Sequence, residues 1–105
     1  MLSEIISSNY YKILLEYDNM DNIVKVIGVK MFRDKEYRHT FLTYFYDIKN
    51  RIERIIINHE HSYSDKDFGY VYDKNGNLTQ QTLNGKIIDI RSYDDKGNLI
   101  YIENR

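Results

Sequence analysis

The sequence predicts an all-β fold, an antiparallel meander of about eight strands, from three observations. Eleven tyrosines accompany many Ile and Val residues, and these types favour strands. No proline is present, so none removes a donor from a strand. Four segments share one turn pattern, which suits hairpins. We therefore expect a single β domain over residues 1–105, a curved sheet or half-barrel preceded by a short N-terminal segment.

The shared pattern begins with Tyr-Asp, continues through two variable residues to Asp, Asn or Gly, and ends in Ile or Leu. It occurs at 17–23, 46–52, 72–78 and 93–99. An Asp at the first corner of a turn accepts hydrogen bonds from following backbone amides, and the later position suits a left-handed residue. The predicted turn residues are Asp18, Asp47, Asp73, Gly76, Asp94 and Gly97.

The segments between these turns read as strands. The predicted ranges are 10–17, 23–32, 37–46, 52–60, 68–72, 78–83, 86–93 and 99–103. Asn84-Gly85 is the dipeptide most typical of a two-residue hairpin, and residues 33–36 are expected to turn one strand into the next. Residues 61–67 form a longer polar connection, and 1–9 are a short helix or a disordered lead-in.

The apolar residues differ between the two halves of the chain. Residues 23–32, 37–46 and 52–60 carry apolar side chains on both faces, which is typical of strands covered on both sides. We expect this half to form the sheet centre, or to be covered by a partner or by the N-terminal segment. In the strand at 10–17, Tyr11, Ile13, Leu15 and Tyr17 share one face.

Composition excludes several function classes. The chain has no cysteine, which rules out disulfides, thiol catalysis and thiolate metal sites. A net charge of −1 argues against nucleic-acid binding through a basic field. The N-terminus lacks signal-peptide features and no stretch is apolar enough for a membrane span. We expect a cytoplasmic protein with no cofactor, whose partner is neither nucleic acid nor membrane.

Two patterns raise the question of chemistry. His59 and His61 would share a face of a strand and suit a divalent metal or acid–base catalysis, but no third ligand stands at convincing spacing. They also read as surface histidines. The repeated Asp residues are explained by the turns, and calcium would need denser acidic ligands. We therefore predict no catalytic and no metal site, with His39 as a structural histidine.

One segment is predicted to bind a partner. Residues 60–68 mix aromatic and acidic side chains, a composition suited to an anchor that attracts a basic partner; the same composition also fits a solvated loop. The predicted contact residues are Glu60, Tyr63, Asp65, Asp67 and Phe68.

The repeated unit resembles the YD repeat, the Tyr-Asp-x-x-Gly-Asn-Leu motif of Rhs-type and wall-associated bacterial toxin shells. Residues 72–78 and 93–99 match it well; 17–23 and 46–52 lack the Gly, and 46–52 also lacks the Asn. The resemblance implies hairpins and transfers no catalytic residue.

The repeats resemble sequences from toxin loci, and the chain is small and has no predicted catalytic site. These features lead to the hypothesis of an immunity protein. Such a protein is a non-enzyme that occludes the active site of a cognate contact-dependent or Rhs-type toxin domain, such as a nuclease. Two alternatives stay open. One is a structural or carbohydrate-binding YD-repeat module. The other is a small ribonuclease-like enzyme that uses His59 and His61.

Overall fold

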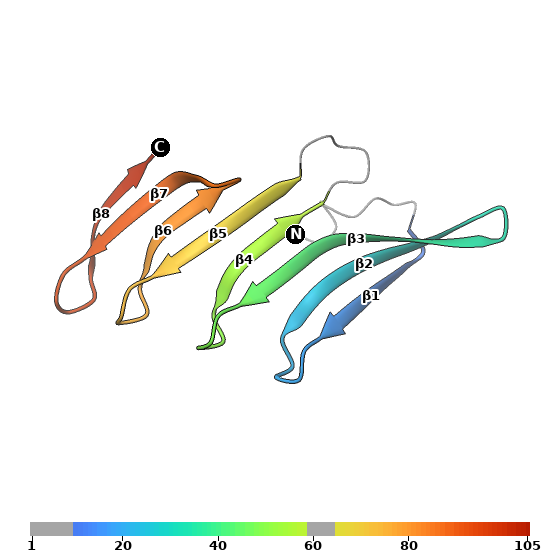
Figure 1. The fold of residues 1–105 in the computed structure, drawn as a ribbon, viewed down its shortest axis with the longest axis horizontal. Helices are drawn as coiled ribbons and strands as arrows, with labels where there is room; N and C mark the ends of the chain where they lie inside the picture. Colours follow the sequence, from blue (N-terminus) through green and yellow to red (C-terminus); the bar gives the residue numbers. More distant parts are fainter. Residues whose placement is uncertain (1–9, 59–64) are drawn as a thin grey trace. The chain divides into compact units, whose positions relative to one another are not determined.

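The computed structural model describes residues 10–58 and 65–105 and confirms the all-β meander (Figure 1). Its strands are β1 (Lys12–Tyr17), β2 (Ile23–Phe32), β3 (Lys35–Tyr46), β4 (Ile52–Ile57), β5 (Lys66–Tyr72), β6 (Leu78–Leu83), β7 (Lys86–Tyr93) and β8 (Leu99–Asn104). They form one antiparallel sheet in chain order. Because β1 and β8 are its two edges, the described strands do not close on themselves.

The chain divides into two compact units. The first comprises Met1–Phe45 and Ile56–Asp65, and the second Tyr46–Ile55 and Lys66–Arg105. The first contains β1, β2 and most of β3, and the second contains β5 to β8. The expectation of a single domain stays a prediction, and the helix or lead-in expected for 1–9 lies outside the described residues.

All four Tyr-Asp segments are hairpin turns. In each, the Asp carbonyl accepts a hydrogen bond from the amide three residues on, and the Asp amide donates to the carbonyl four residues on. The residue after the two variable positions has a positive φ in every copy: Asp21 63°, Asn50 66°, Gly76 87° and Gly97 85°. This is the three-residue hairpin in which a type I turn is followed by a left-handed residue.

The residues that flank three of these turns pair as the sequence predicts. Tyr17 faces Ile23, Tyr72 faces Leu78 and Tyr93 faces Leu99. At the next residue pair away from the turn, the register of each of these three ladders shifts by one residue. Such a bulge adds twist beside the turn, and the sequence pattern had not indicated it.

The register between successive hairpins is also repeated. Each repeat ends in an Ile or Leu, here Ile23 or Leu78. The residue two positions after it faces the residue three positions before the Tyr of the next repeat. Lys25 thus faces Thr43, and Gln80 faces Ile90. The following residues pair likewise, Val26 with Leu42 and Gln81 with Asp89, and both ladders then shift by one residue. The chain is therefore a repeat in its strand pairing as well as in its turns.

Two further hairpins close on two residues each. Asn84 and Gly85 have φ of 51° and 86°, and Arg33 and Asp34 have φ of 51° and 63°. Two positive φ values define the turn that Asn-Gly favours, which confirms the prediction for residues 84–85. At 33–34 the turn is tighter than expected, so β3 begins at Lys35 and pairs with Phe32.

Replacing Asp34 with Gly should stabilise the protein by about 1 kcal/mol, because glycine enters the left-handed region without the cost that other L-residues carry. Asp95 is a matched control, since it is also an exposed turn Asp but is absent from the positive-φ residues. Asp95→Gly should give no gain. Urea unfolding of both variants measures the difference, and equal effects would contradict the turn assignment.

The core lies in β2 and β3. Val26, Ile27, Val29, Phe41 and Leu42 are its buried apolar residues. Tyr10 packs edge-on against Phe41, with ring centroids 5.0 Å apart, and both rings lie over Gly28. Of the three segments expected to be covered on both sides, β2 and β3 contain buried apolar residues, whereas β4 contains none. In β5 to β8 the only buried residue among those described is Asp89.

Several predicted strand ends were wrong by a few residues. The first strand starts at Lys12 rather than residue 10, because Tyr10 turns onto the core. β4 ends at Ile57 rather than residue 60, where the Asn58 amide donates to the Phe41 carbonyl. β5 starts at Lys66 rather than residue 68.

Candidate interaction surface

The predicted contact segment is only partly described. Glu60 and Tyr63 lie outside the described residues. Asp65 is exposed and directly precedes β5. Asp67 and Phe68 belong to β5, where Phe68 is half-buried and faces Leu83 of β6. The structure therefore places these last two residues in the sheet rather than in a loop.

The Asp67 carboxylate has a partner within the sheet. Arg54 of β4 donates to both of its oxygens, from Nε at 2.9 Å and from a terminal nitrogen at 2.7 Å. This paired hydrogen bond holds the pKa of Asp67 below its ordinary value of 3.8. The Asp67 amide also donates to Asn84 Oδ1 at 2.9 Å. Asp67 thus ties β5 to β4 and to the Asn-Gly turn.

The four turn carboxylates act within their own hairpins. In each, Asp Oδ1 accepts from the amides two and four residues on, at 2.8–3.0 Å. The amide four residues on is the largest cause that lowers the pKa of each carboxyl below 3.8. Their predicted role as turn residues is confirmed. The carboxylates concerned are Asp18, Asp47, Asp73 and Asp94.

These lowered pKa values predict loss of stability in acid. A carboxyl with a lower pKa in the folded than in the unfolded state stabilises the fold above the unfolded value, here 3.8. That contribution is lost as the pH falls through the folded pKa. We expect the urea midpoint to drop steadily from about pH 5 to about pH 2.

Asp73→Asn is the control for this pH effect, since it keeps an acceptor oxygen but cannot ionise. This substitution should lower the urea midpoint at neutral pH. The urea midpoint of the variant should also fall less steeply than that of the parent protein as the pH is lowered. A midpoint that does not change with acid in the parent protein would contradict this role of the carboxylates.

The degenerate repeat at 46–52 has Arg51 where the other three have Asn. The Asn side chains donate to the other oxygen of their turn Asp at 3.1–3.4 Å, and Arg51 Nε does the same to Asp47 at 2.8 Å. The guanidinium also lies 4.3 Å from the ring centre of Tyr72. Arg51 therefore replaces the Asn and adds a contact to the next hairpin, which the repeat pattern alone did not reveal.

Arg51→Asn should restore the usual repeat and keep a side-chain hydrogen bond to Asp47, but it loses the ion pair with Asp47 and the stacking on Tyr72, at a cost of about 0.5–1 kcal/mol. Arg51→Ala should cost more, because it also removes the hydrogen bond to Asp47. Thermal unfolding by circular dichroism compares the two. If Arg51→Asn proved as damaging as Arg51→Ala, the contact with Tyr72 would outweigh the turn bond, contrary to expectation.

Repeat tyrosines connect successive hairpins through their hydroxyls. Tyr72 Oη donates to the carbonyl of Ile52 at 2.6 Å, and Tyr93 Oη donates to that of Leu78 at 2.7 Å. In both cases the acceptor is the last residue of the preceding repeat. The Tyr that begins a repeat and the Ile or Leu that ends it therefore close their own hairpin, and they also link it to the neighbouring repeats.

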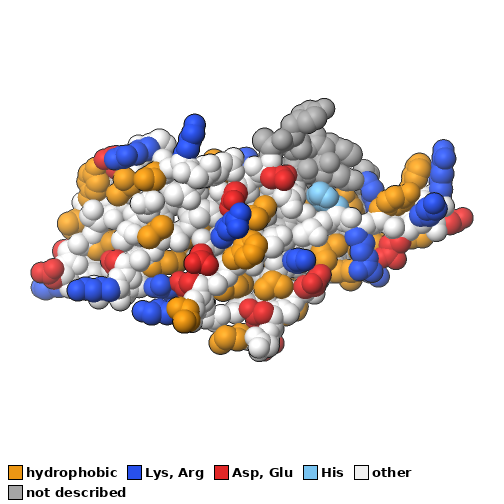
Figure 2. Space-filling view, in the orientation of Figure 1, with side chains coloured by type: hydrophobic (Ala, Val, Ile, Leu, Met, Phe, Trp, Pro, Cys, Tyr) orange, Lys and Arg blue, Asp and Glu red, His pale blue; other side chains and the backbone are white. Residues whose placement is uncertain are grey.

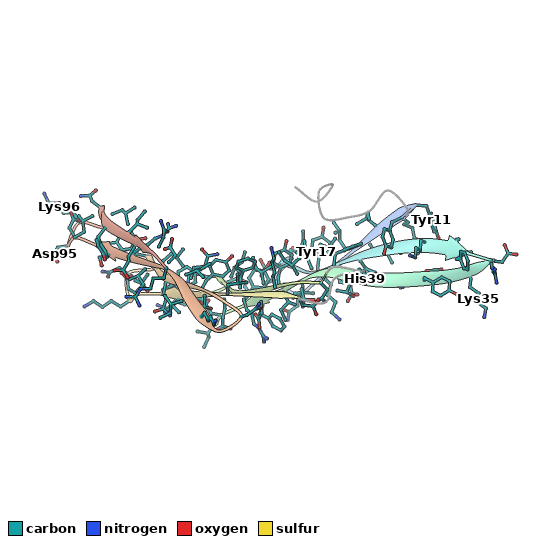
Figure 3. The ribbon with its side chains drawn as sticks, turned by 90° about the horizontal axis from the view of Figure 1, so that it is seen from above. Tyr11, Tyr17, Lys35, His39, Asp95 and Lys96 are labelled. Carbon is teal, nitrogen blue, oxygen red and sulfur yellow. The ribbon has the colours of Figure 1, made fainter. Side chains whose placement is uncertain are left out.

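The edge strand β1 and the residue before it carry a row of exposed apolar side chains. Tyr11 is 59% exposed, Ile13 40%, Leu15 41% and Tyr17 54%. Successive odd positions of a strand share a face, so these side chains form one row, here called the β1 face. Tyr11 and Tyr17 mark its two ends in Figure 3, and hydrophobic side chains reach the surface in this part of the space-filling view (Figure 2).

Of the three histidines, only His39 lies within the described residues. His59 and His61 lie outside the described residues. His39 Nε2 lies 3.0 Å from the Asn58 carbonyl, and the ring packs edge-on against Phe41 at 4.6 Å, which agrees with a structural role. Among residues 10–58 and 65–105, no group of three or more acidic or histidine side chains is placed to hold a metal ion.

The same described ranges include no helix with the length and hydropathy of a membrane span. Comparison with known proteins adds no assignment, because neither a family model nor a curated protein matches this chain.

Proposed function

We propose that this chain is a non-catalytic protein-binding inhibitor. In its specific form, it is an immunity protein that binds a cognate contact-dependent or Rhs-type toxin domain in the cytoplasm and covers the toxin's active site. The observation that carries the proposal is the β1 face, a row of exposed aromatic and aliphatic side chains on an edge strand.

The chemistry of this face suits protein binding. Tyrosine is enriched among the residues that contribute most to binding energy, and aliphatic side chains between such anchors exclude water. The face alternates in this way, with Tyr11 and Tyr17 around Ile13 and Leu15. Glu16 points to the opposite side of the strand by the same alternation. At one end of the face, the Lys12 ammonium group lies 5.9 Å from the centre of the Tyr11 ring.

The choice of a toxin as partner rests on the resemblance of the repeats to those of toxin shells. The turn that follows β1 is held by its own carboxylate, because Asp18 Oδ1 accepts hydrogen bonds from the amides of Met20 and Asn22. Asp67 is engaged with Arg54, so it contributes less to this proposal than its sequence position suggested.

The test is a calorimetric titration of the full chain with the toxin domain encoded directly upstream of its gene. The proposal expects a stable complex and loss of toxin activity in it. Tyr11→Ser with Tyr17→Ser should weaken binding at least tenfold, the effect of losing interface anchors. Tyr37→Ser is the matched control, because Tyr37 is also exposed but lies on β3.

The proposal fails if no toxin gene adjoins this one, or if no complex forms at micromolar concentration. Equal weakening by the control variant would move the binding site away from the β1 face.

A further inference from the structure

The two edge strands of this sheet are complementary to each other. The internal hairpin at 72–78 offers a tyrosine hydroxyl to the repeat before it and a carbonyl to the repeat after it, since Tyr72 donates to Ile52 and Leu78 accepts from Tyr93. At the first repeat, the Tyr17 hydroxyl makes no hydrogen bond with the described residues, and its side chain is exposed. At the last, Leu99 lies on β8, which has no strand on its outer side among those described.

We propose that β8 of one molecule pairs with β1 of a second copy of this chain, continuing the repeat across the contact. The hydroxyl of Tyr17 then donates to the carbonyl of Leu99, as Tyr93 donates to Leu78 within the chain. This inference does not rest on the proposed function, because it is argued from the strand register and the backbone edge of β1 and not from the exposure of the β1 face.

The repeated register fixes which residues meet. Applied to Leu99 and Tyr17, the rule seen at β2–β3 and at β6–β7 places Tyr101 opposite Leu14 and Ile102 opposite Ile13. After the register shift, Glu103 lies opposite Tyr11 and Lys12. Apolar residues therefore meet apolar residues. Glu103, whose carboxylate also pairs with Arg105 of its own strand, meets the ammonium group of Lys12, and opposite charges on neighbouring strands stabilise the pairing.

The backbone groups at this edge agree with the register. The Arg105 amide donates to the Ile88 carbonyl, and the pattern alternates along an antiparallel ladder. Arg105 and Glu103 therefore bond inward to β7, while the amide and carbonyl of Ile102 point outward. In the proposed contact these outward groups meet those of Ile13. Unpaired groups of this kind make an edge strand ready to pair with another chain.

The test is sedimentation velocity of the full chain from about 1 µM to about 500 µM, a range over which mass action separates monomer from dimer. The proposal expects a reversible, concentration-dependent increase in mass. Ile102→Pro removes the outward amide without removing a bond to β7, a position where an edge strand tolerates proline. It should weaken the association at least tenfold.

A charge exchange tests the register and keeps the proposal falsifiable if Ile102→Pro disturbs the fold. Lys12→Glu alone and Glu103→Lys alone should each weaken self-association about three- to tenfold, since like charges then face each other. An equimolar mixture of the two variants should associate better than either alone, because the carboxylate introduced in one variant then meets the ammonium group introduced in the other.

A chain that stays monomeric at every concentration overturns the proposal and leaves the edges to strands of a different protein. Association that neither Ile102→Pro nor the charge exchange affects also overturns it, because the contact then lies on another surface.

Discussion

Phe41→Ala will lower the free energy of unfolding by about 3–5 kcal/mol, the usual cost of removing a buried phenylalanine side chain. Phe41 is 2% exposed and is among the largest fully buried side chains of the described residues. Its ring packs edge-on against both Tyr10 and His39. The truncation therefore leaves a cavity beneath two aromatic rings in a core of few residues, and cavities that cannot collapse are the most costly.

Phe45→Ala is the matched control for this prediction, because it removes the same side chain from the same strand. Phe45 is 39% exposed, so its loss should cost far less. Urea unfolding followed by far-ultraviolet circular dichroism measures both variants. Similar losses at the two positions would contradict the placement of the core at β2 and β3.

Gly28→Ala should destabilise the protein by about 1–3 kcal/mol, because it forces extra volume into a filled site. A methyl group at this position would lie 2.5 Å from Phe41 Cε2 and 2.8 Å from Tyr10 Cδ1. Both atoms belong to rings packed on one another, so neither moves without disturbing the other. The backbone of Gly28 itself is ordinary strand, and the cost is one of space.

A double-mutant cycle separates this cost from a general preference for glycine. In a Phe41→Leu background the ring that the methyl group would meet is gone, and Gly28→Ala should cost less than in the parent. If the two substitutions proved additive, Phe41 would not be the residue that restricts position 28.

The turns could be predicted from sequence because their chemistry is local. Asp at the corner and Asp, Asn or Gly at the left-handed position suffice to specify each hairpin, and the structure shows that geometry even at Asp21 and Asn50, where glycine is absent. The same local logic placed β2, β6 and β7 at their observed bounds. The turn at Arg33-Asp34 was less visible, since neither residue type by itself indicates a left-handed pair.

The contacts between hairpins were beyond sequence reasoning. Nothing in a lone Tyr-Asp pair indicates that Tyr93 reaches the carbonyl of Leu78, because that contact depends on the register between strands that are not joined by that turn. The pairing of Asp67 with Arg54 was missed for the same reason, as the two residues lie on neighbouring strands. The exposure of the β1 face could be predicted only in part. Alternation shows which side chains share a face, but it does not show whether other residues bury that face.

Nuclear Overhauser spectroscopy of the full chain tests most directly whether the Tyr-Asp segments are equivalent antiparallel hairpins. The structure predicts cross-strand contacts between Tyr72 and Leu78 and between Tyr93 and Leu99, each followed by a one-residue shift to Val71 with Gln80 and to Ser92 with Tyr101. Sequential helical contacts through two of these segments, or cross-strand contacts without the shift, would contradict the repeat on which the fold and both proposals depend.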